Sequence, residues 1–114
     1  MTISERQVGS ITVLALSGKL ISDNAGQLKE KIASLTGAGH KQIVLNLAGI
    51  SYIDSSGLGE MASCHTTVTR EQGAIKLANL GKRSIDLLVM TRLIMVFDVC
   101  DSEDEAIAGF GASA

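Results

Sequence analysis

Proline is absent from this 114-residue sequence, and Tyr and Phe together contribute only three residues. The scarcity of aromatic side chains argues against a stacking platform for single-stranded nucleic acid. The net charge of −2, without a basic stripe, argues against binding to a phosphate backbone. We therefore expect no nucleic-acid partner. Because proline is missing, element boundaries must be read from Gly, Ser, Asn and Asp.

Long apolar runs are missing as well. No run approaches the length of a membrane span, and Met1 to Gly9 carries charges where a signal peptide would be apolar. We expect no direct membrane insertion. The two cysteines, Cys64 and Cys100, lack the spacing of a metal or redox motif. A reducing cytoplasm is therefore the expected location, and no metal or other cofactor is expected.

Catalytic combinations are also scarce. A nucleophilic hydrolase needs a serine, a histidine that activates it and a carboxylate that orients the histidine, but the chain has only His40 and His65. His65 falls on the apolar face of a predicted helix, which favours a partly buried packing residue. No nucleophile elbow, P-loop or dinucleotide fingerprint is present. We expect a protein that is not an enzyme.

The overall composition is that of a folded protein. Hydrophobic residues make up 46% of the chain and charged residues 19%, which excludes a disordered segment. At this length we expect one domain over residues 1–114 with a substantial core.

Strand and helix patterns alternate along the chain. Strands are predicted at Ile3 to Val8, Ile11 to Leu16, Gln42 to Leu47, Ala74 to Leu80 and Leu93 to Val99. A tight turn at Gly9-Ser10 joins the first two, and Gly18 is expected to end the second. The helices are predicted from Ser22-Asp23-Asn24 to Gly37 or Gly39, from the turn after Asp54 to near Gly73, around Ile85-Leu88-Val89, and after the capping box Ser102 to Glu105. This order predicts a mixed central sheet of four to five strands covered by about four helices.

The most informative segment is the turn Asp54-Ser55-Ser56-Gly57-Leu58-Gly59. It places two adjacent hydroxyls where a strand is expected to pass into a helix, so the backbone N–H groups of the new helix are still unpaired. A phosphate is well tolerated there, because the free N–H groups and the helix dipole both favour negative charge. The turn is therefore either an ordinary N-cap or a phosphorylation switch.

The residues around this turn resemble a known family. The central part of the STAS domain is similar in sequence to two segments of this chain, Val44-Leu45-Asn46-Leu47 and Ile50 through Gly59. Within the family, these segments are most similar to bacterial anti-sigma factor antagonists. The resemblance extends to the chain length, the element order, Leu16-Ser17-Gly18 at a strand end and Gln72-Gly73-Ala74 at the entry to another strand.

The resemblance implies a mechanism. Unphosphorylated antagonists bind a cytoplasmic anti-sigma factor, which is also a serine kinase related to histidine-kinase-like ATPases, and so release a sigma factor for transcription. The kinase inactivates its antagonist by phosphorylating the serine that follows the motif aspartate, which is Ser55 in this chain. A serine phosphatase is the expected partner for the reverse step.

Several roles within the turn stay open. Ser56 could cap the helix while Ser55 points outward, or the two could exchange roles, with Ser56 as the alternative phosphorylation site. Gly57 and Gly59 either admit a partner's backbone or form a tight connection. Leu58 is either an exposed anchor or a core residue, and Tyr52 and Ile53 are expected to pack. The expected partner-binding residues are Asp54, Ser55, Ser56, Gly57, Leu58, Gly59 and Asp23.

One segment departs from the family pattern. The antagonists usually carry an acidic-apolar-acidic run after the strand-end glycine, whereas Gly18 here precedes Lys19-Leu20-Ile21, with Asp23 two residues later. A second function class is therefore kept: a STAS interaction or scaffold subunit that no kinase controls, in a signalling complex or beside a membrane transporter.

Overall fold

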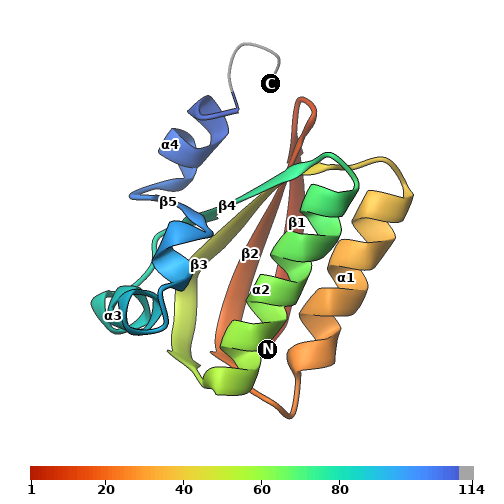
Figure 1. Cartoon of the computed structure of the whole chain (residues 1–114). Helices are drawn as coiled ribbons and strands as arrows, with labels where there is room; N and C mark the ends of the chain where they lie inside the picture. The colour runs from red at the N-terminus through yellow and green to blue at the C-terminus, as the bar shows by residue number, and fades with distance from the viewer. Residues whose placement is uncertain (111–114) are drawn as a thin grey trace.

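The computed structural model describes residues 1–110, the side chain of Ala25 excepted, so the last four residues of the expected 1–114 domain lie outside the described residues (Figure 1). The strands are β1 (Thr2–Val8), β2 (Ile11–Leu20), β3 (Gln42–Ile53), β4 (Ala74–Ala78) and β5 (Asp98–Cys100). The helices are α1 (Ala25–Gly37), α2 (Ser55–Arg70), α3 (Lys82–Met90) and α4 (Glu103–Ala108), with a 3-10 turn, η1, at Leu93–Met95.

The five strands form one mixed sheet in the order β1-β2-β3-β4-β5. A hairpin through Gly9 makes β1 antiparallel to β2, and every later pairing is parallel. In Figure 1, α1 and α2 lie side by side on one face of the sheet and run in the same direction, opposite to β2 and β3. The predicted element order and the mixed sheet are confirmed.

Alternating side chains build a core on each face of the sheet. The face toward α1 and α2 is filled by large aliphatic residues of the strands, which pack on helix residues: Leu14, Leu16, Ile43, Leu45 and Leu77 on Leu28, Ile32, Met61 and Val68. The opposite face carries a smaller cluster that α4 covers through Ala106. These contacts fix the positions of α1 and α2, and so the position of the turn that starts α2.

The two central strands run further than predicted. Gly18 does not end β2: it adopts φ of +106° at an irregularity in the pairing with β3, and β2 continues to Leu20. A left-handed φ is inexpensive for glycine, so the residue bends the strand instead of terminating it. Opposite it, β3 continues past Leu47 to Ile53. The strand therefore ends directly at the Asp54 turn.

The extension of β3 has a neighbour on one side only. β3 pairs with β4 from Gln42 to Asn46, and β4 ends at Ala78 instead of the predicted Leu80. The last seven residues of β3, from Leu47 to Ile53, are therefore held by β2 alone.

The predicted last strand exists, but its predicted bounds, Leu93 to Val99, are wrong. Its first part forms η1, which follows Arg92 in the left-handed conformation (φ +64°), and only Asp98–Cys100 pairs with β4. Leu93 and Ile94 pack against the core, whereas Met95 is 83% exposed. Two adjacent inward side chains are the pattern of a tight turn, because a strand would send them to opposite faces.

Candidate functional site

The turn predicted to carry function lies at one end of the sheet. Figure 1 shows that α2 begins where β2 and β3 end, beside the loop that leads from β2 into α1. The loop comprises residues 21–24 and the turn begins at Asp54. Carboxyl ends of neighbouring parallel strands meet at the same edge of a sheet, and this is a common place for functional groups.

Asp54 caps α2. Its backbone is extended (φ −95°, ψ −178°), its Oδ1 accepts from the Gly57 N–H at 2.8 Å, and its Oδ2 accepts from the Ser22 N–H at 3.2 Å. Neither serine caps the helix, so the prediction that Ser56 is the cap is wrong, and so is the alternative in which Ser55 takes that role. Ser56 is already the second residue of the helix, and only the residue before the first helical position can reach the N–H two or three residues on. The same carboxylate also holds the β2–α1 loop.

Ser55 and Ser56 occupy the first two positions of α2, and both are exposed. The first bond of the helical ladder runs from the Leu58 N–H to the Asp54 carbonyl at 2.9 Å, so the N–H groups of both serines precede the ladder. The first turn contains no acidic residue. The arrangement thus offers exposed hydroxyls in the positive end field of a 16-residue helix.

Gly57 is held tightly beneath the turn. A Cβ at this position would lie 2.0 Å from the carbonyl oxygen of Leu20, the same oxygen that accepts from the Asp54 N–H at 3.2 Å. The tight-connection interpretation therefore accounts for Gly57. Leu58 is 5% exposed and belongs to the core. Gly59 is exposed, and a Cβ there would meet nothing within 4 Å.

The β2–α1 loop is fixed by its own hydrogen bonds. Asn24 stands at the start of α1 but does not cap it: its Oδ1 accepts from the Ile21 N–H at 3.1 Å and its Nδ2 donates to the Lys19 carbonyl at 2.9 Å. Lys19 and Asp23 are exposed, and Ile21 is half-buried. Asp23 therefore stands in the loop that Asp54 anchors, so the structure brings these predicted site residues to one end of the domain.

His65, Cys64 and Cys100 are packing residues. His65 is half-buried with its ring edge-to-face on Phe97, 5.5 Å between centroids, which confirms the expected packing role. It also lies ten residues beyond Ser55, or about 15 Å along the helix axis. Cys64 and Cys100 are free thiols in separate core clusters, and burial raises the pKa of Cys64 to about 12. Neither thiol is therefore suited to nucleophilic chemistry.

The profile of the STAS domain matches residues 2–106 of this chain. The chain belongs to the STAS domain family. One relative, the anti-sigma-B factor antagonist of Bacillus subtilis, is 32% identical over 84 residues, which cover 74% of this chain and 76% of the relative. BtrV of Bordetella bronchiseptica is 26% identical over 110 residues, covering 96% and 95% of the two chains. The resemblance to STAS domains of the anti-sigma factor antagonist type is thus confirmed.

Solved structures agree with the fold. A Thermotoga maritima protein superposes with a TM-score of 0.88 at 21% identity, over 94% of this chain and 92% of its own. The phosphorylated form of SpoIIAA, a Bacillus cell fate determinant, superposes with a TM-score of 0.74 at 21% identity, over 96% of this chain and 100% of its own. At these identities the superpositions establish a STAS fold. None of the helices in residues 1–110 has the length and apolar character needed to cross a bilayer.

One feature beside the turn was missed from the sequence. Tyr52, predicted to pack, is 46% exposed, whereas Ile53 is buried as expected. On α3, Val89 is 54% exposed, whereas the neighbouring Leu88 is buried. The signal available was the excess of apolar residues at the end of α3, where Leu87-Leu88-Val89-Met90 exceeds what one buried helix face can take.

Proposed function

We propose that this STAS domain is an anti-sigma factor antagonist that phosphorylation of Ser55 switches off. In the unphosphorylated form it binds a cytoplasmic anti-sigma factor that is also a serine kinase, and so releases a sigma factor. The observation that carries the proposal is the exposed Ser55 hydroxyl at the first position of α2. Because Asp54 supplies the cap, this hydroxyl is not needed to hold the helix.

The local electrostatics support a switch that leaves the fold intact. A phosphate on Ser55 adds about −1.5 to −2 charges, and the N–H groups of Ser55 and Ser56 are placed to receive negative charge. Asp54 stands next to the phosphate, and its carboxylate already accepts two backbone N–H groups. The added charge is therefore concentrated on the surface that a partner must touch, where it opposes binding by repulsion and bulk.

The relatives support the same assignment. The Bacillus subtilis protein is named an anti-sigma-B factor antagonist, and SpoIIAA has been solved in a phosphorylated form. On this proposal the domain is a cytoplasmic regulator without catalytic activity of its own. The kinase belongs to the histidine-kinase-like ATPases, and a serine phosphatase restores the active form. Asp23 and the exposed part of the turn, Ser55, Ser56 and Gly59, form the contact surface.

The test begins with a pull-down from the native cytosol, using wild type and Ser55→Ala as bait. We expect both to retain a histidine-kinase-like ATPase. With ATP, that purified ATPase should add one phosphate to wild type and to the matched control Ser56→Ala, and none to Ser55→Ala, as read by mass spectrometry. Ser55→Asp should bind it about tenfold more weakly, because like charges at an interface oppose association. A phosphate mapped to any other residue would overturn the proposal.

A second candidate rests on the β2–α1 loop. Lys19 and Ile21 stand where the antagonists usually carry acidic residues, and Lys19 is exposed at the end of β2. This surface would suit a STAS interaction or scaffold subunit without kinase control. The same pull-down separates the two candidates, since retention of transporter or scaffold subunits, with no ATPase and no phosphate on Ser55, supports the second.

A further inference from the structure

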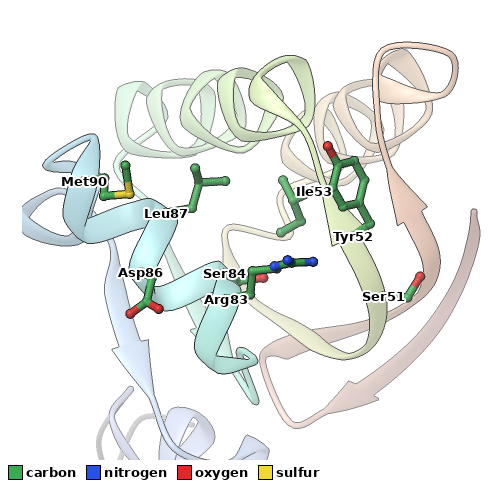
Figure 2. A pocket seen from close by; sticks show the side chains of 8 residues that line it. All are labelled: Ser51, Tyr52, Ile53, Arg83, Ser84, Asp86, Leu87 and Met90. Atoms are coloured by element: carbon green, nitrogen blue, oxygen red, sulfur yellow. The ribbon is translucent and has the colours of Figure 1, made fainter.

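A groove lies beside the extension of β3. It has a volume of about 300 Å³ and is lined by Ser51, Tyr52, Ile53, Arg83, Ser84, Asp86, Leu87 and Met90. Figure 2 shows Leu87 and Met90 of α3 on one wall, and Tyr52 and Ile53 of β3 on the other. The groove therefore lies between a strand that ends at Ile53 and a helix that begins at Lys82.

The groove follows from the unequal lengths of β3 and β4. β4 ends at Ala78, opposite Asn46, so no strand lies against the last seven residues of β3 on that side. The chain turns instead into α3, which begins at Lys82. A helix is wider than a strand and cannot continue the sheet pairing, so a hollow remains between α3 and the strand.

Part of the apolar lining of this groove is exposed. Met90 is 80% exposed and Tyr52 is 46% exposed, while Leu87 is half-buried. Aromatic and Met side chains are enriched in the buried centres of protein interfaces. The charged residues Arg83 and Asp86 are both exposed on α3, where they would form a polar rim.

The groove lies within reach of a partner that touches Ser55. Tyr52 precedes Ser55 by three residues, so their Cα atoms are at most about 11 Å apart. A standard interface covers about 800 Å² on each partner, equivalent to a disc of roughly 16 Å radius. An interface centred on the Ser55 hydroxyl is therefore wide enough to reach Tyr52 and the groove beside it.

We propose that the groove between β3 and α3 receives one or two large apolar side chains of the same protein that phosphorylates Ser55. The inference rests on the proposed function and says which contacts give the STAS domain its affinity for the kinase. Apolar burial at Tyr52 and Met90 holds the two proteins together, while the charge at Ser55 decides whether they associate. An affinity determinant separate from the modified serine lets the kinase bind its target strongly before phosphate transfer.

Two methionines provide a matched test. Met90 lines the groove, whereas Met95 in η1 does not, although the two are 80% and 83% exposed. Binding of the ATPase retained in the pull-down is measured by calorimetry for Met90→Gln, Met95→Gln and Tyr52→Ser. We expect Met90→Gln and Tyr52→Ser to raise its Kd about 10- to 30-fold, and Met95→Gln to change it less than about twofold. Circular dichroism verifies that each variant is folded.

Phosphorylation kinetics complete the test. In Met90→Gln we expect KM for the STAS domain to rise in step with Kd while kcat stays unchanged, because the reacting hydroxyl is untouched. If the ATPase binds and phosphorylates Met90→Gln and Tyr52→Ser as it does wild type, the groove proposal is overturned and the Ser55 switch stands. If no ATPase phosphorylates Ser55 in wild type, the switch fails and the groove assignment fails with it.

Discussion

Two helices of this domain, α2 and α4, begin with the same cap geometry and differ in the charge of their first turn. Asp54 accepts from the Gly57 N–H before α2, and Ser102 accepts from the Glu105 N–H at 3.1 Å before α4. The first turn of α4 contains three carboxylates, whereas that of α2 contains none and presents two exposed serines.

The two first turns differ in whether they carry a charged side chain of their own. In α4, Glu103 is fixed: it accepts from the Asn46 side chain at 2.8 Å and pairs with Arg6, so its negative charge joins the helix to β3 and β1. In α2, the field of the helix N-terminus acts on two serine hydroxyls, and on the proposed function Ser55 gains charge when it is phosphorylated. The same helix-end electrostatics thus stabilises a fixed contact of Glu103 at α4 and leaves two exposed, uncharged serines at α2.

The largest expected change in stability tests how closely the start of α2 packs against the end of β2. Gly57→Ala should lower the free energy of unfolding by about 3 kcal/mol, because the new Cβ would meet the Leu20 carbonyl. The matched control Gly59→Ala has open space and should raise it by about 0.5–1 kcal/mol, as alanine favours a helix. Urea unfolding of both variants measures the difference. Equal effects would show that α2 is not held against the end of β2.

A smaller effect compares the two caps. Asp54→Ala removes the acceptor for two N–H groups, one of them in the β2–α1 loop, and should cost about 2 kcal/mol. Ser102→Ala removes the acceptor for one and should cost about 1 kcal/mol. Thermal unfolding at pH 7 ranks the two. A larger loss for Ser102→Ala would contradict the view that Asp54 joins two segments.

The smallest effect concerns the fixed charge of α4. The hydrogen bond from Asn46, and then the interaction with Arg6, hold the pKa of Glu103 below 4.5 despite partial burial. Because its pKa is lower in the folded state, Glu103 stabilises the domain above pH 4.5, and this contribution is lost as pH falls through the lowered value. Glu103→Gln should therefore be less stable than wild type at pH 7, with the gap narrowing below pH 4.5. A gap that is constant with pH, measured by urea unfolding, would contradict this account.

The sequence predicts the sheet and the helices well because their signals are local. Alternation over Ile11 to Leu16 and the i, i+4 pattern of Leu28 and Ile32 each report a buried face without knowledge of the rest of the chain. Gly9 and the Ser102 cap act through their own backbone and their nearest neighbours. The position of Ser55 at the start of a helix belongs to the same class of local information.

The features that the sequence predicts wrongly depend on contacts between distant segments of the chain. Gly18 looks like a strand end, but pairing with β3 carries β2 onward to Leu20. Ser56 resembles a cap as closely as Asp54 does, but only Asp54 also accepts from the Ser22 N–H of another loop, a contact that the local sequence does not reveal. Tyr52 is exposed because β4 stops short, which no pattern around Tyr52 can reveal.

The extension of β3 also bears on aggregation. An unpaired strand edge in the middle of a sheet is a template on which a foreign strand can add. Irregular pairing with β2 accompanies this segment near Gly18, and α3 stands across the groove from Ser51, Tyr52 and Ile53. Bulges and a neighbouring helix are devices by which β-sheet proteins obstruct such addition. The helix that forms one wall of the groove thus also stands across the unpaired edge of β3, where it obstructs the addition of a foreign strand.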